Sequence, residues 1–482
     1  MDLTYTPPAS ASYAARAGDR YLAALGGVLL GYALFSRTFA YLGVPPLFIG
    51  EIMLGLGVLV ALSSGGLRPA LGSWTIRLWG ALLVWTAIRT APYLGSYGLD
   101  APRDAMLVVY GVYAVIVAAL VLASPERLAW AVRRYSTFVT VMLAGAWVVY
   151  LAAKLLGAGQ PTLPWAPVFL FEAKGGDLMV HMTGITAFLV LGLRQRTTVW
   201  FALAAFSAGI IMVSNRGGMV AYVLGLGLAW LLRPRGTFGR SAKLVYAFFG
   251  LLVIGLIAGP VLELQVQGGS RDLTVEQVVE NVTSIFTSSG SNSLDGTKRW
   301  RLLWWGKIVD YTLGGPYFWD GKGFGINLAE SDGFTLGDDG GLRSPHNGHL
   351  TVLARAGVPG AALWVLLHAV WFLGLLAAWM RARLAEQQRW TAVFAWIAAI
   401  WIAALVNASF DVYLEGPMGG VWLWSLMGLG IAAARLQRTH PDLLGDATSA
   451  PAPPPSFAPT PHDLRPPAPS RASADPAPTW SW

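Results

Sequence analysis

A short polar segment, 343–349 (RSPHNGH), stands directly before a long apolar stretch and contains side chains suited to proton transfer. Histidine is the side chain best suited to accept a proton near neutral pH, and Pro345 fixes the backbone that leads to His346. The segment therefore makes His346 a candidate general base, with Arg343 and Asn347 beside it as candidate substrate-binding groups. A purely structural role in capping the following helix is the alternative.

A metal site in the same segment is the less favoured interpretation. His346 and His349 stand three residues apart, and Asp338 and Asp339 are close to them in sequence. The usual zinc pattern includes a further ligand at a defined spacing, which this segment lacks. We therefore predict no metal.

Two arginine-containing segments are candidates for binding an anion. In the turn 214–218 (SNRGG), Arg216 lies between two apolar stretches, and the glycines after it would let the backbone approach a ligand closely. A guanidinium group offers a fixed fork of donors that matches phosphate. The segment 298–305 (KRWRLLWW) has apolar residues at helical spacing and carries three cations, Lys298, Arg299 and Arg301. Both segments suit a phosphate or diphosphate group.

Each of these two segments also has an interpretation without a ligand. Arg216 would reach the lipid phosphates from the end of its span. The segment 298–305 would lie as an amphipathic helix on the membrane surface, with its Trp residues as anchors. The residues themselves leave these alternatives open.

Further polar residues stand at the ends of apolar stretches. Asp177 and His181 are four residues apart and therefore share a helix face. They form either a self-neutralising pair near the membrane interface or, with Lys174, a polar wall for a sugar or a lipid-linked headgroup. Asn407 and Asp411 lie near the outer end of another stretch and would join the same cavity.

The composition requires lipid around most of the chain. Of the 482 residues, 55% are hydrophobic and only 12% are charged, so a soluble core cannot hide the apolar surface. The net charge of +8 comes from short basic clusters between apolar stretches, which argues for topology signals and against a nucleic-acid partner. The absence of Cys excludes disulfides, thiolate metal sites and a cysteine nucleophile.

The predicted fold is an all-α polytopic membrane protein. A helix that crosses the hydrocarbon core needs about 20 mostly apolar residues. Such windows, about twelve in number, lie at 21–42, 44–63, 72–90, 105–124, 136–157, 178–193, 198–214, 217–232, 243–262, 350–379, 390–408 and 413–434.

The distribution of Lys and Arg predicts the orientation and the domains. These residues cluster at alternate ends of the windows, which makes those ends and both termini cytoplasmic. One large loop with short helices would face the opposite side, and its Gly-rich part, 321–341, would be a mobile cover. The predicted regions are the N-terminal segment 1–20, helices one to nine in 21–262, the loop 263–348, the last three helices in 349–434, and a disordered Pro/Ala-rich cytoplasmic tail at 435–482.

The sequence resembles the O-antigen ligase and O-antigen polymerase superfamily of bacterial inner-membrane glycosyltransferases. The resemblance covers roughly residues 170–430 and rests on motifs in a fixed order. These are SNRGG at 214–218, RWRLLWW followed by GKGFGINL in the loop, and PHNGHLTVLARAGVPG at 345–360. The loop would then be periplasmic.

The resemblance implies a reaction and a set of roles. A glycan carried on undecaprenyl diphosphate would be transferred at the periplasmic face to an acceptor hydroxyl, on a glycan or a lipid, without a metal or another cofactor. Arg216 and Arg301 would bind the diphosphate, with Arg299 as the alternative to Arg301, and His346 would be the base. Asn347 and Lys174 are candidates for orienting the donor.

The chemistry is consistent with these residues. Breaking the bond between an anomeric carbon and a diphosphate puts negative charge on the leaving oxygen, which paired arginines stabilise. A transporter or flippase of lipid-linked sugars is the alternative, but transporters place their sites at mid-membrane, whereas these residues gather at the outer edge. The sequence does not distinguish a ligase from a polymerase.

Overall fold

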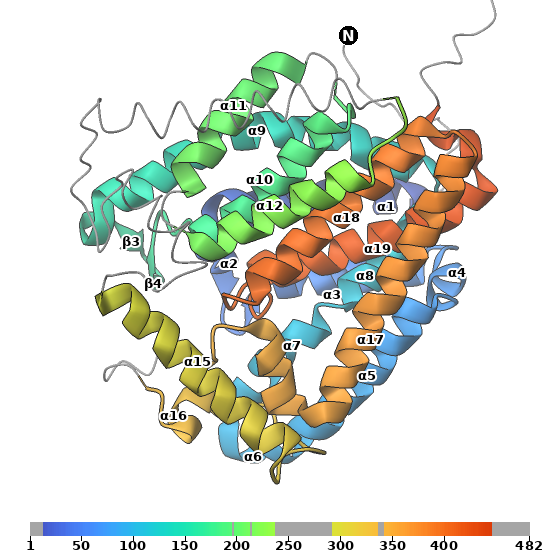
Figure 1. Cartoon of the computed structure of the whole chain (residues 1–482). Helices are drawn as coiled ribbons and strands as arrows, with labels where there is room; N and C mark the ends of the chain where they lie inside the picture. Colours follow the sequence, from blue (N-terminus) through green and yellow to red (C-terminus); the bar gives the residue numbers. More distant parts are fainter. Residues whose placement is uncertain (1–12, 195–196, 213–214, 237–291, 336–341, 446–482) are drawn as a thin grey trace, which may run out of the picture. The chain divides into compact units, whose positions relative to one another are not determined.

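The computed structural model describes residues 13–194, 197–212, 215–236, 292–335 and 342–445, and these residues are mostly helical (Figure 1). The strands among them form two small antiparallel pairs, β1 (Gly43–Val44) with β2 (Leu47–Phe48) and β3 (Thr162–Leu163) with β4 (Ala166–Phe169).

The helices before the loop are α1 (Tyr13–Phe35), α2 (Arg37–Ala40), α3 (Ile49–Leu62), α4 (Leu67–Leu71), α5 (Trp74–Thr90), α6 (Leu94–Tyr97), α7 (Asp100–Val109), α8 (Val112–Ala123), α9 (Glu126–Leu156), α10 (Gly175–Val190), α11 (Thr197–Met212) and α12 (Arg216–Leu231), with short 3-10 turns at Ala91–Tyr93 and Gly157–Gly159. The loop contains α15 (Asn292–Leu313) and α16 (Leu328–Asp332). It is followed by α17 (Gly348–Leu384), α18 (Gln388–Ala408), α19 (Pro417–Thr439) and a 3-10 turn at Pro441–Leu444.

Several of these helices have the length and composition of membrane spans. Within the described residues, five helical segments are long and apolar enough to cross a membrane: Asp100–Ala123, Glu126–Gly159, Gly348–Leu384, Gln388–Ala408 and Pro417–Thr439. Shorter apolar helices accompany them. The prediction of an all-α membrane protein is confirmed, whereas the predicted number of twelve spans is not. Every predicted window overlaps a helix except 243–262, which lies outside the described residues.

The predicted span 105–124 is interrupted because a neighbouring side chain enters it. The α-helical hydrogen bonding is interrupted between α7 and α8 at Tyr110 and Gly111, although both residues keep helical backbone angles and Asp100–Ala123 runs on as one span. Trp79 of α5 donates its indole N–H to the carbonyl of Val108 at 2.9 Å and occupies the place that a side chain at residue 111 would need. Only glycine leaves room for this contact, so the break has a tertiary cause that periodicity does not reveal.

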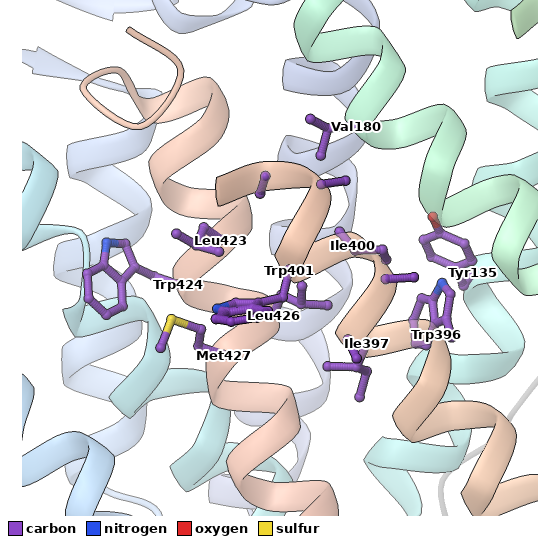
Figure 2. Close-up of a cluster of buried hydrophobic side chains, with 14 of the residues drawn as sticks. Tyr135, Val180, Trp396, Ile397, Ile400, Trp401, Leu423, Trp424, Leu426 and Met427 are labelled. Carbon is purple, nitrogen blue, oxygen red and sulfur yellow. The ribbon is translucent and has the colours of Figure 1, made fainter. Parts of the chain in front are cut away.

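The interior consists of helices α10, α12 and α18 packed against one another, with α8 against α19 and α5 against α17. Large aromatic side chains fill the contacts. Tyr135 of α9 lies 4.6 Å, centroid to centroid, from Trp396 of α18, and Figure 2 shows the two rings side by side. Such pairs add to the free energy gained by burying their area.

The described part of the loop has a small core of its own. Trp304 of α15 is fully buried and stacks on Phe334 at 5.3 Å, and its indole N–H donates to Asp332 Oδ2 at 2.7 Å. The ammonium group of Lys322 donates to the other oxygen of Asp332 at 2.5 Å. A carboxylate with no exposure is tolerated only with such partners, so Asp332 fixes the fold of this segment.

The Gly-rich part of the loop is attached to a kink in α17. Gly357 has a φ of 67°, which interrupts the helix. There the amides of Lys322 and Gly323 donate to the carbonyls of Ala354 and Arg355 at 2.7 and 2.9 Å. The expected mobile cover is therefore wrong for residues 321–332, which are packed and hydrogen-bonded, while residues 336–341 lie outside the described part.

Candidate functional site

His346 sits in a tight turn at the start of α17. The Asn347 side chain caps this helix by accepting from the amides of His349 and Leu350, both at 3.1 Å. The carbonyl of Pro345 accepts from the indole N–H of Trp305 at 2.8 Å. These contacts hold His346 at a φ of 53°, a left-handed conformation that is costly for a residue other than glycine and is found at functional sites.

Asp411, in the turn between α18 and α19, lies between two basic groups. Its Oδ1 atom is 3.6 Å from His346 Nδ1 and 3.4 Å from Lys174 Nζ. Burial alone would raise the pKa of Asp411, but the contacts with His346 and Lys174 outweigh burial and hold this pKa below its usual range. Burial would lower the pKa of Lys174, and the carboxylates of Asp411 and Asp177 outweigh it and raise that pKa. An ionised carboxylate therefore lies beside the His346 ring.

Helix α15 brings Arg301 to the same turn. Arg301 Nη1 donates to the carbonyl of Phe410 at 3.0 Å, one residue before Asp411. Trp305, one helical turn further, binds the residue before His346. From one face of α15, Arg301 thus contacts the turn before α19 and Trp305 contacts the turn before α17. Lys298 and Arg299 are exposed near the start of α15, so the geometry favours Arg301 over Arg299 at this position.

The SNRGG turn meets these residues at the start of α12. Arg216 is the first residue of the helix, and Asn215 caps it by accepting from the amide of Gly218 at 2.6 Å. A Cβ atom on Gly217 would lie 2.9 Å from the Cβ of Phe410, and one on Gly218 would lie 3.1 Å from the Cα of Gly176. The glycines therefore allow this close packing. The side chain of Arg216 lies outside what the structure describes, as does Ser214.

Asp177 and His181 are buried on α10, about one and two turns after Lys174. Asp177 Oδ1 accepts from Asn407 Nδ2 at 3.3 Å, and both side chains are buried. The His181 ring packs against Trp422 and Phe138, with centroids 5.0 and 6.1 Å away. These contacts favour a packing role for His181 and an interhelical hydrogen bond for Asp177.

Arg343 is held by the carboxylates of α7. Its guanidinium binds Asp100 and Asp104, both at 3.2 Å, and donates to the carbonyl of Gly325 at 2.8 Å. Arg355 of α17, which is 2% exposed, binds the same oxygen of Asp104 at 3.0 Å. This network ties the loop to two helices, so its geometry favours a structural role for Arg343.

His349 points away from His346. Its Nε2 lies 3.0 Å from the carbonyl of Leu405, and its Nδ1 accepts from the indole of Trp364 at 3.1 Å. Both ring nitrogens are thus engaged within the protein. No group of three or more His, Asp or Glu side chains in the described residues is arranged to hold a metal ion, and Asp338 and Asp339 lie outside those residues.

Sequence reasoning missed Glu415 and Arg355. Glu415 accepts from the Thr351 hydroxyl at 2.8 Å and so joins the first turn of α17 to the turn that carries Asp411. Burial raises the pKa of Glu415. Arg355 could have been found from the sequence, because it is a charged residue inside the apolar window 350–379.

A comparison with known families agrees with this geometry. Residues 201–365 match the family model described as O-antigen ligase. The matched interval contains the start of α12, helix α15 and the turn of His346, and it ends before Asp411. No curated protein matches the chain. The order of motifs predicted a resemblance to the O-antigen ligase superfamily, and the match over residues 201–365 confirms that resemblance.

Proposed function

We propose that this chain is a glycosyltransferase that moves a glycan from undecaprenyl diphosphate to an acceptor hydroxyl. The family match supports a membrane ligase or polymerase role. The observation that carries the finer proposal is the meeting of His346, Lys174 and Arg301 around the turn 410–411, beside the start of α12. A base and several cations within one small region suit the attack of a hydroxyl on a diphosphate-linked sugar.

His346 acts as the general base in this proposal. With Nδ1 facing Asp411, the proton of the neutral ring resides on Nδ1, and Nε2 accepts the proton of the acceptor hydroxyl. Asp411 then stabilises the imidazolium that forms. The 3.6 Å separation is longer than a good hydrogen bond, and contacts of this kind often shorten when substrate binds. A base placed in this way contributes about a hundred- to ten-thousandfold to the rate.

The cations stabilise the leaving diphosphate. Arg301 is anchored to the carbonyl of Phe410, and negative charge is favourable near the start of a helix such as α12. Arg216 begins that helix, and Lys174 Nζ lies 3.4 Å from Asp411 Oδ1. Together these groups would balance the charge that develops on the leaving oxygen.

The same proposal assigns the protein to the bacterial inner membrane, with the site at the periplasmic face and both termini in the cytoplasm. At the ends of α12 and α17 that are remote from the site, Arg383 Nη1 donates to the carbonyl of Arg233 at 2.8 Å. Arg389 and Arg435 belong to the same side of the predicted topology. This concentration of arginine supports a cytoplasmic location for that side.

Reconstitution tests the proposal. The full chain in liposomes receives a glycan on polyprenyl diphosphate, together with either a lipid A core or a second lipid-linked repeat unit as acceptor. We expect a product whose mass identifies ligation or polymerisation, and we expect His346→Ala to abolish it while His440→Ala, at the far end of α19, does not. An unchanged rate in His346→Ala would refute the base, and no product with either acceptor would favour transport.

A further inference from the structure

A cavity of about 430 Å³ lies between α1, α8, α9, α18 and α19, and it includes none of the residues proposed for the reaction. Its walls are mainly hydrocarbon, from side chains such as Leu25, Val117 and Leu426. Phe138 and Trp422 also line it, and His181 packs on both of these rings.

The cavity is open along α1 because that helix has small residues there. Gly26 and Gly27 are exposed, and no atom lies within 4 Å of where a Cβ on either would be. Ala23, one turn earlier, is also exposed and lines the same wall. A ligand can therefore enter across this exposed face of α1, which in a membrane protein is in contact with lipid.

Polar groups occur at defined places in this apolar lining. Arg134 of α9 is exposed at the cavity edge, with its guanidinium 5.9 Å from the ring of Trp130. Arg127, nearby on the same helix, is buried and binds Asp19 at 2.7 Å. Ser425, which is 6% exposed, lines the wall, and its hydroxyl has no hydrogen-bond partner within the described part of the chain. A buried hydroxyl without a partner is unfavourable, which points to a ligand with an acceptor.

We propose that this cavity binds one acyl chain of an anionic phospholipid, with the phosphate at Arg134. The hydrocarbon walls match the acyl chain, and the exposed guanidinium matches the phosphate. The carbonyl oxygen of the acyl ester can accept from the Ser425 hydroxyl. A basic residue beside an apolar pocket between transmembrane helices is a common arrangement for binding anionic headgroups.

Native mass spectrometry of the full chain in detergent tests this site. Phosphatidylglycerol and phosphatidylcholine with identical acyl chains are added in turn, and the bound fraction is measured against lipid concentration. We expect phosphatidylglycerol to bind about tenfold more tightly. Equal binding of the two lipids would overturn the proposal, as would displacement of phosphatidylglycerol by an equimolar polyprenyl phosphate.

Matched variants locate the binding. Gly27→Leu fills the cavity, whereas Gly374→Leu adds the same side chain at an exposed glycine of α17 that also has open space around it. We expect about tenfold weaker binding of phosphatidylglycerol in Gly27→Leu and no change in Gly374→Leu. Equal affinity in both variants would overturn the proposal. Ala23→Leu fills the same wall and provides the comparison where Gly27→Leu does not fold.

The headgroup contact has its own pair of variants. Arg134→Gln should abolish the preference for phosphatidylglycerol over phosphatidylcholine, while Arg133→Gln, at the exposed neighbour that does not line the cavity, should retain it. A preference that survives in Arg134→Gln would overturn the assignment of the phosphate. Because these experiments measure lipid binding only, their outcome is separate from that of the proposed reaction.

Discussion

Replacing Asp411 by Asn tests the central feature of the proposed site, a carboxylate beside the His346 ring. The substitution keeps the shape of the side chain and removes its charge. For unit charges 3.6 Å apart, Coulomb's law gives about 1 kcal/mol in water and about 4.6 kcal/mol at an effective dielectric constant of about 20. The two side chains are 29% and 19% exposed, so we take about 2 kcal/mol.

This energy acts on the imidazolium that forms during the reaction, so Asp411→Asn should lower kcat about thirtyfold. The measurement is the rate of glycan transfer at saturating donor in the reconstituted system. We expect little change in the KM for the donor, because the charge on His346 develops only as the acceptor proton is taken.

Asp310→Asn is the matched control, since Asp310 is an exposed carboxylate on α15 and should leave the rate unchanged. Thermal unfolding of both variants separates a loss of catalysis from a loss of fold. A folded Asp411→Asn protein with a rate within about twofold of the unchanged chain would refute the role given to this carboxylate.

Further predictions concern charge geometry, the loop and pH. Arg216→Lys should lose nearly as much transfer activity as Arg216→Ala, because a lysine cannot reproduce the guanidinium fork; full activity in the lysine variant would show that a point charge suffices. Lys322→Met should lower the unfolding free energy by about 3–5 kcal/mol, since it leaves Asp332 buried without its ion pair, and an unchanged melting temperature would contradict this. The lowered pKa of Asp411 contributes stability above the carboxyl's unfolded pKa, and this stability is lost as pH falls toward the folded pKa. Below about pH 5 the melting temperature should therefore fall more steeply in the unchanged chain than in Asp411→Asn. Parallel curves of melting temperature against pH for the two proteins would contradict this prediction.

The apolar windows located helices well because burial in lipid constrains every residue of a span. The helix boundaries depended on contacts that no local pattern contains. Trp79 interrupts 105–124 from another helix, and the kink at Gly357 exists because residues 318–323 bind there, with the amide of Val358 donating to the carbonyl of Phe318 at 2.8 Å. Periodicity shows which face of a helix is apolar, but it does not show which side chains of other helices will pack against that face.

The candidate site residues were chosen because an ionisable side chain at the edge of the membrane is energetically costly without a partner. The sequence does not indicate which partners these side chains have. His346, Lys174 and Arg301 stood out as ionisable groups at the edge of the membrane, and the structure gathers them around one turn. Arg343 had the same signal, yet its carboxylate partners are more than 200 residues away, with a separation of 243 residues for Asp100. His181 resembled a polar wall because its aromatic neighbours come from two other helices.

The backbone of His346 gives a physical reason for the buried charges of the loop. A left-handed histidine persists only where surrounding contacts outweigh its cost, and Trp305 supplies one such contact from α15. That helix is held in turn by Trp304, whose indole binds Asp332. The core of the loop therefore offsets the backbone strain at His346. A substitution of Asp332 should displace Trp305 and lower the transfer rate, although Asp332 itself contacts no substrate. The two networks, at Asp332 and at Asp104, are best understood as the rigid support of one turn.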